Sequence, residues 1–278
     1  MKLKLTMWMI IPAILIFLIT KYITSSEANE VEPQNNLPKL SDATIHKDEI
    51  AKVKLDLIDS FEWEKRGIVT FWFDDAWMSQ YTNGFPILEK HGFKGALAVP
   101  TELIKYEGYI KWWQIKKLQF NGWEINSHSV SHECDQEIMT YKKLEFELRY
   151  SKIEIMSQGL LADNYVVPCG VVDNKLNEIA KTYYKSMRTS EPGLNDIPLE
   201  DPYFIKADTI INTTKIEDIK GLLNDAKVNR KWVVLMFHQI DYSNDIYAIT
   251  PEFLDEITKL VEESKLQVAL PEQVLSIK

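Results

Sequence analysis

Short apolar runs alternate with amphipathic segments along most of the chain. The apolar runs are rich in β-branched and aromatic residues and have the length of buried strands. We predict strands at residues 68–73, 96–99, 123–126, 165–167, 185–188, 232–237 and 266–270. The strongest signals are IVTFWF at 68–73 and WVVLMF at 232–237, because these are the longest of the runs and consist almost entirely of apolar, mostly β-branched and aromatic residues.

Amphipathic segments with helical spacing lie between these strands, and we predict helices at residues 85–90, 111–120, 141–159, 174–183 and 216–226. A further helix should begin at Thr250, Pro251 and Glu252, which suit the N-cap, the first helical position and the first turn. Regular alternation of strands and helices implies parallel strands with helical connections. A total of about seven or eight strands favours a barrel-like closure over an open doubly wound sheet.

The first 24 residues differ in kind from the rest of the chain. Lys2 and Lys4 precede an uncharged apolar run at residues 5–20, and Lys21 follows it. The run is longer than a typical signal-peptide core but shorter than the ~20 residues that span a bilayer comfortably. We therefore interpret residues 1–24 as a signal peptide or an uncleaved membrane anchor. Because both lysines precede the run, the positive-inside rule places the remainder outside the cytoplasm.

A polar segment follows this run. Residues 25–44 are rich in Ser, Asn, Glu and Pro, so we interpret residues 25–65 as a linker and entry segment. Residues 66–278 are enough for one domain, and a hydrophobic content of 45% over the whole chain allows a substantial core. The net charge of -9 argues against a nucleic-acid partner, which would need basic clusters. Two cysteines are too few for a disulfide-built scaffold.

Polar side chains that can do chemistry follow several predicted strands. They are Asp74 and Asp75 after 68–73, His128 and His132 after 123–126, and His238 after 232–237. Because the carboxyl ends of parallel strands meet at one face of the fold, we expect these side chains to gather there. Three of the five histidines of the chain fall at these points, which argues against a chance arrangement.

This set of residue types suits metal-dependent hydrolysis. Histidines four residues apart can converge on one ion, and one carboxylate completes a three-ligand site with an open position for water, as at catalytic zinc. The second aspartate is then free to act as a general base for that water. A histidine from a distant strand can protonate the leaving group. These requirements describe amide or ester hydrolysis.

The same residues resemble the motifs of polysaccharide deacetylases with the NodB homology domain, carbohydrate esterase family 4. The family's TFDDG motif is similar to FWFDDA at residues 71–76, and its H-[ST]-x-x-H motif is matched in full by HSVSH at 128–132. Its RPPxG loop is similar to VVPCG at 166–170, and its late histidine to LMFH at 235–238. The resemblance covers about residues 66–275 and implies a distorted (β/α)-barrel of about seven parallel strands.

The resemblance also implies a role for each site residue. Asp74 would be the general base and His238 the general acid, while Asp75, His128 and His132 would hold one divalent metal ion. Zinc is the expected ion, with cobalt and nickel as alternatives. Pro168, Cys169 and Gly170 would form the oxyanion and substrate loop, in which the Cys169 N–H meets the oxyanion. Trp77, beside the acid pair, is the aromatic residue that we expect in the cleft.

Three features depart from the family pattern. Val166 stands where the family usually has the arginine that orients the catalytic base, and Ala76 replaces the glycine after the acid pair. No Asp-x-x-Asp-Trp motif is found, which leaves Asp241 as a local candidate for the partner of the acid histidine. Cys134 and Cys169 fall near the predicted site, where three interpretations stay open: ordinary small residues, a disulfide or a metal-facing thiol.

The implied reaction removes acetyl groups from N-acetylglucosamine units of a cell-surface or extracellular polysaccharide. An acetylated polysaccharide is therefore the expected partner, and the membrane is a second one if residues 1–24 are retained. The expected location is anchored to the membrane and facing outside, or secreted. Two alternatives stay open: a hydrolase of the same fold acting on an O-acetyl ester or another non-peptide amide, and a catalytically silent module that binds glycan. Retention of all five polar residues argues against the silent module.

Overall fold

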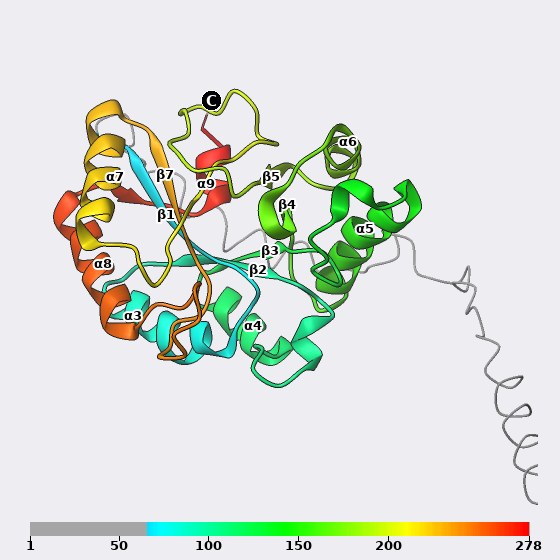
Figure 1. The fold of residues 1–278 in the computed structure, drawn as a ribbon, viewed down its shortest axis with the longest axis horizontal. Helices are drawn as coiled ribbons and strands as arrows, with labels where there is room; N and C mark the ends of the chain where they lie inside the picture. Colours follow the sequence, from blue (N-terminus) through cyan, green and yellow to red (C-terminus); the bar gives the residue numbers. More distant parts are fainter. Residues whose placement is uncertain (1–65, 278) are drawn as a thin grey trace, which may run out of the picture. The chain divides into compact units, whose positions relative to one another are not determined.

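The computed structural model describes residues 66–277, which are drawn in colour in Figure 1. The predictions for residues 1–24 and 25–65 lie outside the described residues. Within residues 66–277, no helix combines the length and the apolar character that crossing a membrane requires.

A curled sheet of parallel strands runs through the middle of the domain (Figure 1). Its order is β5-β4-β3-β2-β1-β7-β6, and β8 also pairs with β1. The strands are β1 (Ile68–Phe73), β2 (Gly95–Val99), β3 (Glu124–Ser127), β4 (Asn164–Val166), β5 (Ser186–Arg188), β6 (Asp208–Thr209), β7 (Trp232–Phe237) and β8 (Gln267–Val268). All pairings between these strands are parallel, which confirms the predicted distorted (β/α)-barrel class.

Helices follow most of the strands and cover the outside of the sheet (Figure 1). They are α3 (Phe85–Lys90), α4 (Trp112–Phe120), α5 (Tyr141–Ser157), α6 (Asn174–Tyr183), α7 (Ile216–Asn229), α8 (Pro251–Ser264) and α9 (Pro271–Leu275). A π-helical turn (Gln80–Gly84) precedes α3, and 3-10 turns lie at Leu103–Lys105, Gln136–Ile138 and Pro168–Gly170. The predicted helices are confirmed, with ends that shift by at most a few residues.

Both faces of the sheet are buried, so the central strands read as continuous apolar runs. Alternate residues of β1, such as Phe71, pack against α3, α4, α7 and α8. The intervening residues, such as Trp72, face Trp232 and the α9 residue Val274. A third apolar cluster joins α5 and α6 to β4 through Tyr165. Packing on two faces fixes the ends of the strands and hence the rim at which the predicted site residues lie.

The last predicted strand, 266–270, is partly wrong. β8 has only the two residues Gln267 and Val268, so the strand is shorter than predicted at both ends. Pro271 then begins α9, since proline suits the first helical position. β6 was missed because Asp208 and Thr209 form no apolar run. Three residues before β6, Ile205 forms a parallel bridge with Arg188 of β5. Because β6 pairs with β7, residues 205–209 contact β5 at one end and β7 at the other.

The predicted N-cap of α8 provides a test of the helix boundary. The Thr250 hydroxyl accepts the Phe253 N–H at 3.2 Å, and Pro251 occupies the first turn. We expect Thr250→Ala to lower the free energy of unfolding of the full chain by about 1 kcal/mol, while Thr250→Ser retains the cap and most of that energy. Denaturant unfolding measures both variants. Equal losses in the two would show that the hydroxyl does not cap the helix.

Candidate active site

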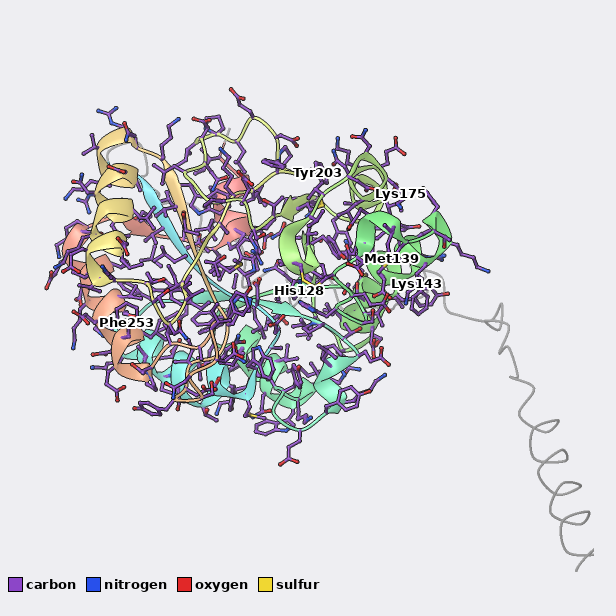
Figure 2. The ribbon with its side chains drawn as sticks, in the orientation of Figure 1. His128, Met139, Lys143, Lys175, Tyr203 and Phe253 are labelled. Atoms are coloured by element: carbon purple, nitrogen blue, oxygen red, sulfur yellow. A yellow bond between two sulfur atoms is a disulfide. The ribbon has the colours of Figure 1, made fainter. Side chains whose placement is uncertain are left out.

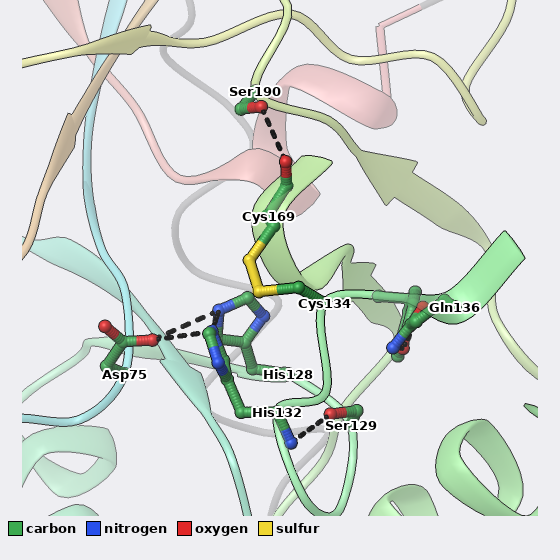
Figure 3. Close-up of a disulfide and its surroundings, with 9 residues drawn as sticks. Asp75, His128, Ser129, His132, Cys134, Gln136, Cys169 and Ser190 are labelled. Atoms are coloured by element: carbon green, nitrogen blue, oxygen red, sulfur yellow. Dashed lines mark hydrogen bonds and ion pairs between the residues drawn. A yellow bond between two sulfur atoms is a disulfide. The ribbon is translucent and has the colours of Figure 1, made fainter. Parts of the chain in front are cut away.

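Asp75, His128 and His132 converge at the carboxyl ends of β1 and β3 (Figure 3). The Asp75 Oδ1 atom lies 3.4 Å from His128 Nε2 and 3.0 Å from His132 Nε2, and the two nitrogens are 3.1 Å apart. Ligand atoms about 2.1 Å from a tetrahedral ion are ~3.4 Å from one another, so the spacing fits a single ion. The structure therefore brings the three predicted ligands together in a geometry that suits a divalent metal.

A tight loop, rather than a helical turn, makes the two histidines converge. Ser129 and His132 have left-handed backbone angles, with φ of 64° and 60°. The Ser129 hydroxyl accepts the His132 N–H at 2.9 Å. From α5, the buried Glu147 carboxylate accepts the N–H groups of Val130 and Ser131 at 3.0 and 2.9 Å. The loop is thus fixed by side chains that the spacing of the motif alone does not reveal.

His128 is buried and has a defined tautomer. Its Nδ1 atom lies 2.9 Å from the Val166 carbonyl oxygen, which can only accept a hydrogen bond. Nδ1 therefore carries the proton, and the Nε2 lone pair faces Asp75 and His132. Burial lowers the pKa of His128, more than its hydrogen bond to Asp75 raises it, which favours the neutral ligand form. Figure 2 places His128 near the middle of the domain.

Asp75 and His132 shift one another's protonation. Burial acts to raise the pKa of Asp75, but hydrogen bonds with His128 and His132 hold that pKa well below its ordinary value. Burial acts to lower the pKa of His132, but the hydrogen bond to Asp75 and the Asp75 charge raise that pKa overall. Trp77 donates its indole N–H to Asp75 Oδ2 at 3.0 Å and so orients the carboxylate. The predicted contact of Trp77 with substrate stays a prediction.

The other aspartate, Asp74, is buried and forms an ion pair with Arg188 of β5. The guanidinium binds Asp74 Oδ2 and lies over the Trp72 ring, 5.3 Å from its centroid. Asp74 Oδ1 has no hydrogen-bond partner in the described part of the chain. The arginine that the sequence lacks at Val166 is therefore supplied by the neighbouring strand. Sequence reasoning missed this pair, although a charged residue in a predicted strand was a signal, because a buried charge needs a partner.

His238 follows β7 and lies beside Asp74, because Phe73 and Phe237 are register partners. The Gln80 side chain donates to both backbone carbonyls, of Asp74 and of His238, the latter at 2.9 Å, and so joins the two strand ends. His238 Nδ1 has no hydrogen-bond partner within residues 66–277. Asp241 instead accepts the Ser243 N–H at 3.0 Å. The structure thus does not show the predicted pairing of Asp241 with His238. Gln80 is a further residue of the site that the sequence analysis did not predict.

The predicted oxyanion and substrate loop is a 3-10 turn, Pro168–Gly170, after β4. Gly170 has φ of 77°, and a Cβ atom there would lie 1.8 Å from the Ser190 hydroxyl oxygen, so only glycine fits. Cys169 forms a disulfide with Cys134, which decides among the three interpretations of the cysteines (Figure 3). The role of the Cys169 N–H towards an oxyanion stays a prediction.

Comparison with known proteins agrees with this geometry. Residues 63–185 match the family model described as polysaccharide deacetylase. A Bacillus subtilis (strain 168) protein named "Putative polysaccharide deacetylase YxkH" is 25% identical over 139 residues, which cover 47% of this chain. The match covers 46% of that protein, so the chain spans about half the length of this curated relative.

Solved structures share the fold at low sequence identity. The T48 deacetylase with substrate has a TM-score of 0.57 and 13% identity, covering 78% of this chain and 94% of that one. The Xyl-CE4 domain of a multidomain xylanase from the hindgut metagenome of Trinervitermes trinervoides has a TM-score of 0.52 and 16% identity, covering 75% and 89%. A CE4 family pseudoenzyme from Bacillus anthracis has a TM-score of 0.51 and 16% identity, covering 76% and 66%.

These structural matches establish the fold, and the pseudoenzyme shows that the fold alone does not establish catalysis. The sequence match is more specific, because residues 63–185 include the acid pair, the two histidines of the predicted metal site and the Pro168–Gly170 turn. Over residues 63–185, the chain is therefore similar in sequence to the polysaccharide deacetylase family, as the motifs predicted.

Proposed function

We propose that the protein is a metal-dependent deacetylase that hydrolyses the N-acetyl groups of N-acetylglucosamine units in a cell-surface or extracellular polysaccharide. The observation that carries the proposal is the convergence of Asp75, His128 and His132, with ligand atoms 3.0 to 3.4 Å apart, beside the Arg188-bound Asp74. The match of residues 63–185 to the polysaccharide deacetylase family model supports the reaction class.

The ligand set suits zinc. One carboxylate and two imidazoles are the donors of many catalytic zinc sites, and cobalt and nickel accept the same donors. A bound divalent ion would polarise the acetyl carbonyl and lower the pKa of a water molecule. The protein's own contribution is to hold Nε2 of His128 unprotonated through the Val166 carbonyl and to orient Asp75 through Trp77.

Asp74 is suited to take the proton of the attacking water. Arg188 occupies Oδ2 and fixes the carboxylate plane, while Oδ1 has no hydrogen-bond partner in residues 66–277. That free oxygen is the atom that can accept a proton. In this proposal Arg188 is a positioning residue, since it acts through Asp74.

His238 is suited to protonate the leaving amine, because it directly follows β7 and so lies at the same rim as Asp74, which follows the paired strand β1. An amide nitrogen must be protonated before it departs, so hydrolysis needs an acid on the side away from the water. The Cys169 N–H of the Pro168–Gly170 turn would stabilise the oxyanion, and Trp77 would contact a sugar ring.

One observation favours a second candidate, the O-acetyl ester substrate. His238 Nδ1 lacks a carboxylate partner within the described residues, so no such group supports a protonated imidazole. An alcohol is a weaker base than an amine and needs less help in leaving. A site in which the predicted general acid, His238, has no carboxylate partner among the described residues therefore suits ester cleavage better than amide cleavage.

We further propose that the domain works on the outer side of the membrane, either anchored by residues 1–24 or secreted. The Cys134–Cys169 disulfide supports this location, because disulfides persist in oxidising compartments. An enzyme in that place would meet cell-surface polysaccharides as substrates.

Acetate release tests the reaction and its substrate. We expect the purified full chain to release acetate from chitin oligomers, poly-N-acetylglucosamine or peptidoglycan when zinc is present, and to lose this activity after chelation until zinc is restored. Acetylated xylan in the same panel reports ester cleavage, and preference for it would favour the second candidate. Absence of release from every substrate, with metal bound, would instead indicate a silent glycan-binding module.

The division of roles between the two aspartates predicts separate effects on rate and on metal binding. We expect Asp74→Asn to lower kcat by roughly 10²- to 10⁴-fold, because the general base is lost. Zinc affinity, measured by calorimetry, should change little, because Asp74 is not a ligand. Asp241→Asn is the matched control and should keep full activity. An Asp74→Asn variant with unaltered kcat would contradict the assignment.

The raised pKa of His132 predicts that zinc affinity falls as the pH decreases. Protons compete with the metal for this imidazole, and because its pKa lies above the ordinary value, competition begins at a higher pH than for a free histidine. Below that pKa, binding should release a proton, which calorimetry in buffers of different ionisation enthalpy detects. Zinc affinity that stays constant between about pH 5 and 8 would rule out His132 as a ligand.

A further inference from the structure

The Cys134–Cys169 disulfide joins the loop of the metal ligands to the predicted oxyanion turn. Cys134 stands two residues after His132, and Cys169 lies in the Pro168–Gly170 turn. The two Cα atoms are 5.3 Å apart although 35 positions separate the residues in the chain. In Figure 3 the bond is drawn above the two imidazoles, and Asp75 lies to their left. One covalent link thus connects two segments with different tasks in the proposed reaction.

The loop that carries His132 is anchored unevenly. Upstream of His132, Glu147 holds the backbone of Val130 and Ser131 through two hydrogen bonds. Downstream, Glu133, Cys134 and Asp135 are all exposed. Glu133 forms an ion pair with Lys143 at 3.5 Å, but both side chains are exposed and such pairs add little stability. The next firm anchor is the Gln136–Ile138 turn, where Lys175 of α6, labelled in Figure 2, donates to the Glu137 carbonyl at 3.0 Å. Between His132 and that turn, the disulfide is the covalent tie to the rest of the domain.

The two ligand histidines also differ in support. His128 is buried and its Nδ1 is bound by the Val166 carbonyl. The His132 side chain is 23% exposed, and the partners of its Nε2 among residues 66–277 are Asp75 and His128. The position of the His132 ring therefore depends on its backbone. That backbone is left-handed at His132, a conformation which persists only where the surroundings enforce it.

The far end of the disulfide lies on a rigid part of the structure. Pro168 is buried, and Gly170 packs so closely on Ser190 that no side chain fits between them. Val166, whose carbonyl orients His128, lies two residues before Pro168 in the same segment, residues 166–170. The disulfide therefore connects the less supported ligand histidine to the segment that already orients the other one.

We propose that the Cys134–Cys169 disulfide is a redox-sensitive positioning element that sets the backbone of His132 and thereby the affinity of the site for its metal. The inference rests on the proposed function, in which these histidines bind metal. Both cysteines are exposed, so a reductant can reach the bond. Reduction by a phosphine breaks the S–S bond with two electrons from phosphorus. Water supplies two protons to the thiolates and one oxygen atom to the phosphine oxide.

A purely structural role for the disulfide makes a different prediction. A bond that only stabilises the fold would lower the melting temperature on reduction but leave metal affinity unchanged at temperatures far below melting. A positioning role changes metal affinity while the fold is intact, as is usual for groups that orient a metal ligand. Metal affinity at a temperature where both forms are folded separates the two roles.

The experiment compares zinc affinity of the full chain before and after treatment with a water-soluble phosphine, at a temperature where circular dichroism shows both forms folded. We expect reduction to weaken zinc binding by about 10-fold. The Cys134→Ser/Cys169→Ser double variant should bind zinc as weakly as the reduced protein and should not respond to the phosphine, which controls for chelation by the reagent. Hydrogen exchange should become faster at residues 129–135 and stay constant in β1 and β7.

Equal zinc affinity in the oxidised and reduced forms would overturn the inference. Tighter zinc binding after reduction would also overturn it, because that result would identify the cysteine thiols themselves as ligands. If the oxidised protein binds no zinc, the proposed function fails, and the inference about metal affinity fails with it. If the oxidised protein binds zinc and releases acetate but reduction leaves its affinity unchanged, only the inference fails. The reduced wild-type chain provides the test even if the double variant does not fold.

Discussion

Parallel pairing of β1 with β7 and β2 is the constraint on which the rest of the site depends. The register joins Phe73 to Phe237 and to Leu97, so these strands end at the same level. Asp74 continues the ladder by donating its N–H to the Phe237 carbonyl at 2.8 Å, and Gln80 then joins the two strand ends. Since side chains alternate between faces, a register shifted by one residue would turn the acid pair away from the histidines.

The ion pair between Asp74 and Arg188 connects the candidate active site to the interior of the barrel. Both side chains are almost fully buried, at 3% and 1% exposed, so each charge needs the other. Removing one partner of such a pair typically costs about 3–5 kcal/mol, because the remaining charge stays buried without compensation. Substitution of Arg188 would therefore affect the fold as well as the orientation of Asp74. The pair also explains how Val166 is tolerated, since the cation is provided by the adjacent strand and Val166 contributes its carbonyl to His128.

Left-handed backbone conformations are concentrated in the site. Asp75, Ala76, His132 and Cys169 all have positive φ, although none is glycine. Each such residue costs on the order of 1 kcal/mol or more, and the surrounding contacts must compensate. Here they include the Glu147 carboxylate, the Ser129 hydroxyl and the disulfide. The local strain aims three ligand atoms at one point, which a regular helix or strand would not do.

The sequence by itself determined the order and type of most elements and the identity of the five polar residues at the strand ends. It could do so because long apolar runs and helical spacing are local signals, and because parallel strands bring their carboxyl ends to one rim. Only the tertiary structure decided that Arg188 replaces the missing arginine, that Gln80 joins β1 to β7, and that Cys134 pairs with Cys169. The short strand β6 likewise exists only through its pairing with β7. These features depend on contacts between residues far apart in the chain, and a one-dimensional pattern carries no direct record of which distant residues meet.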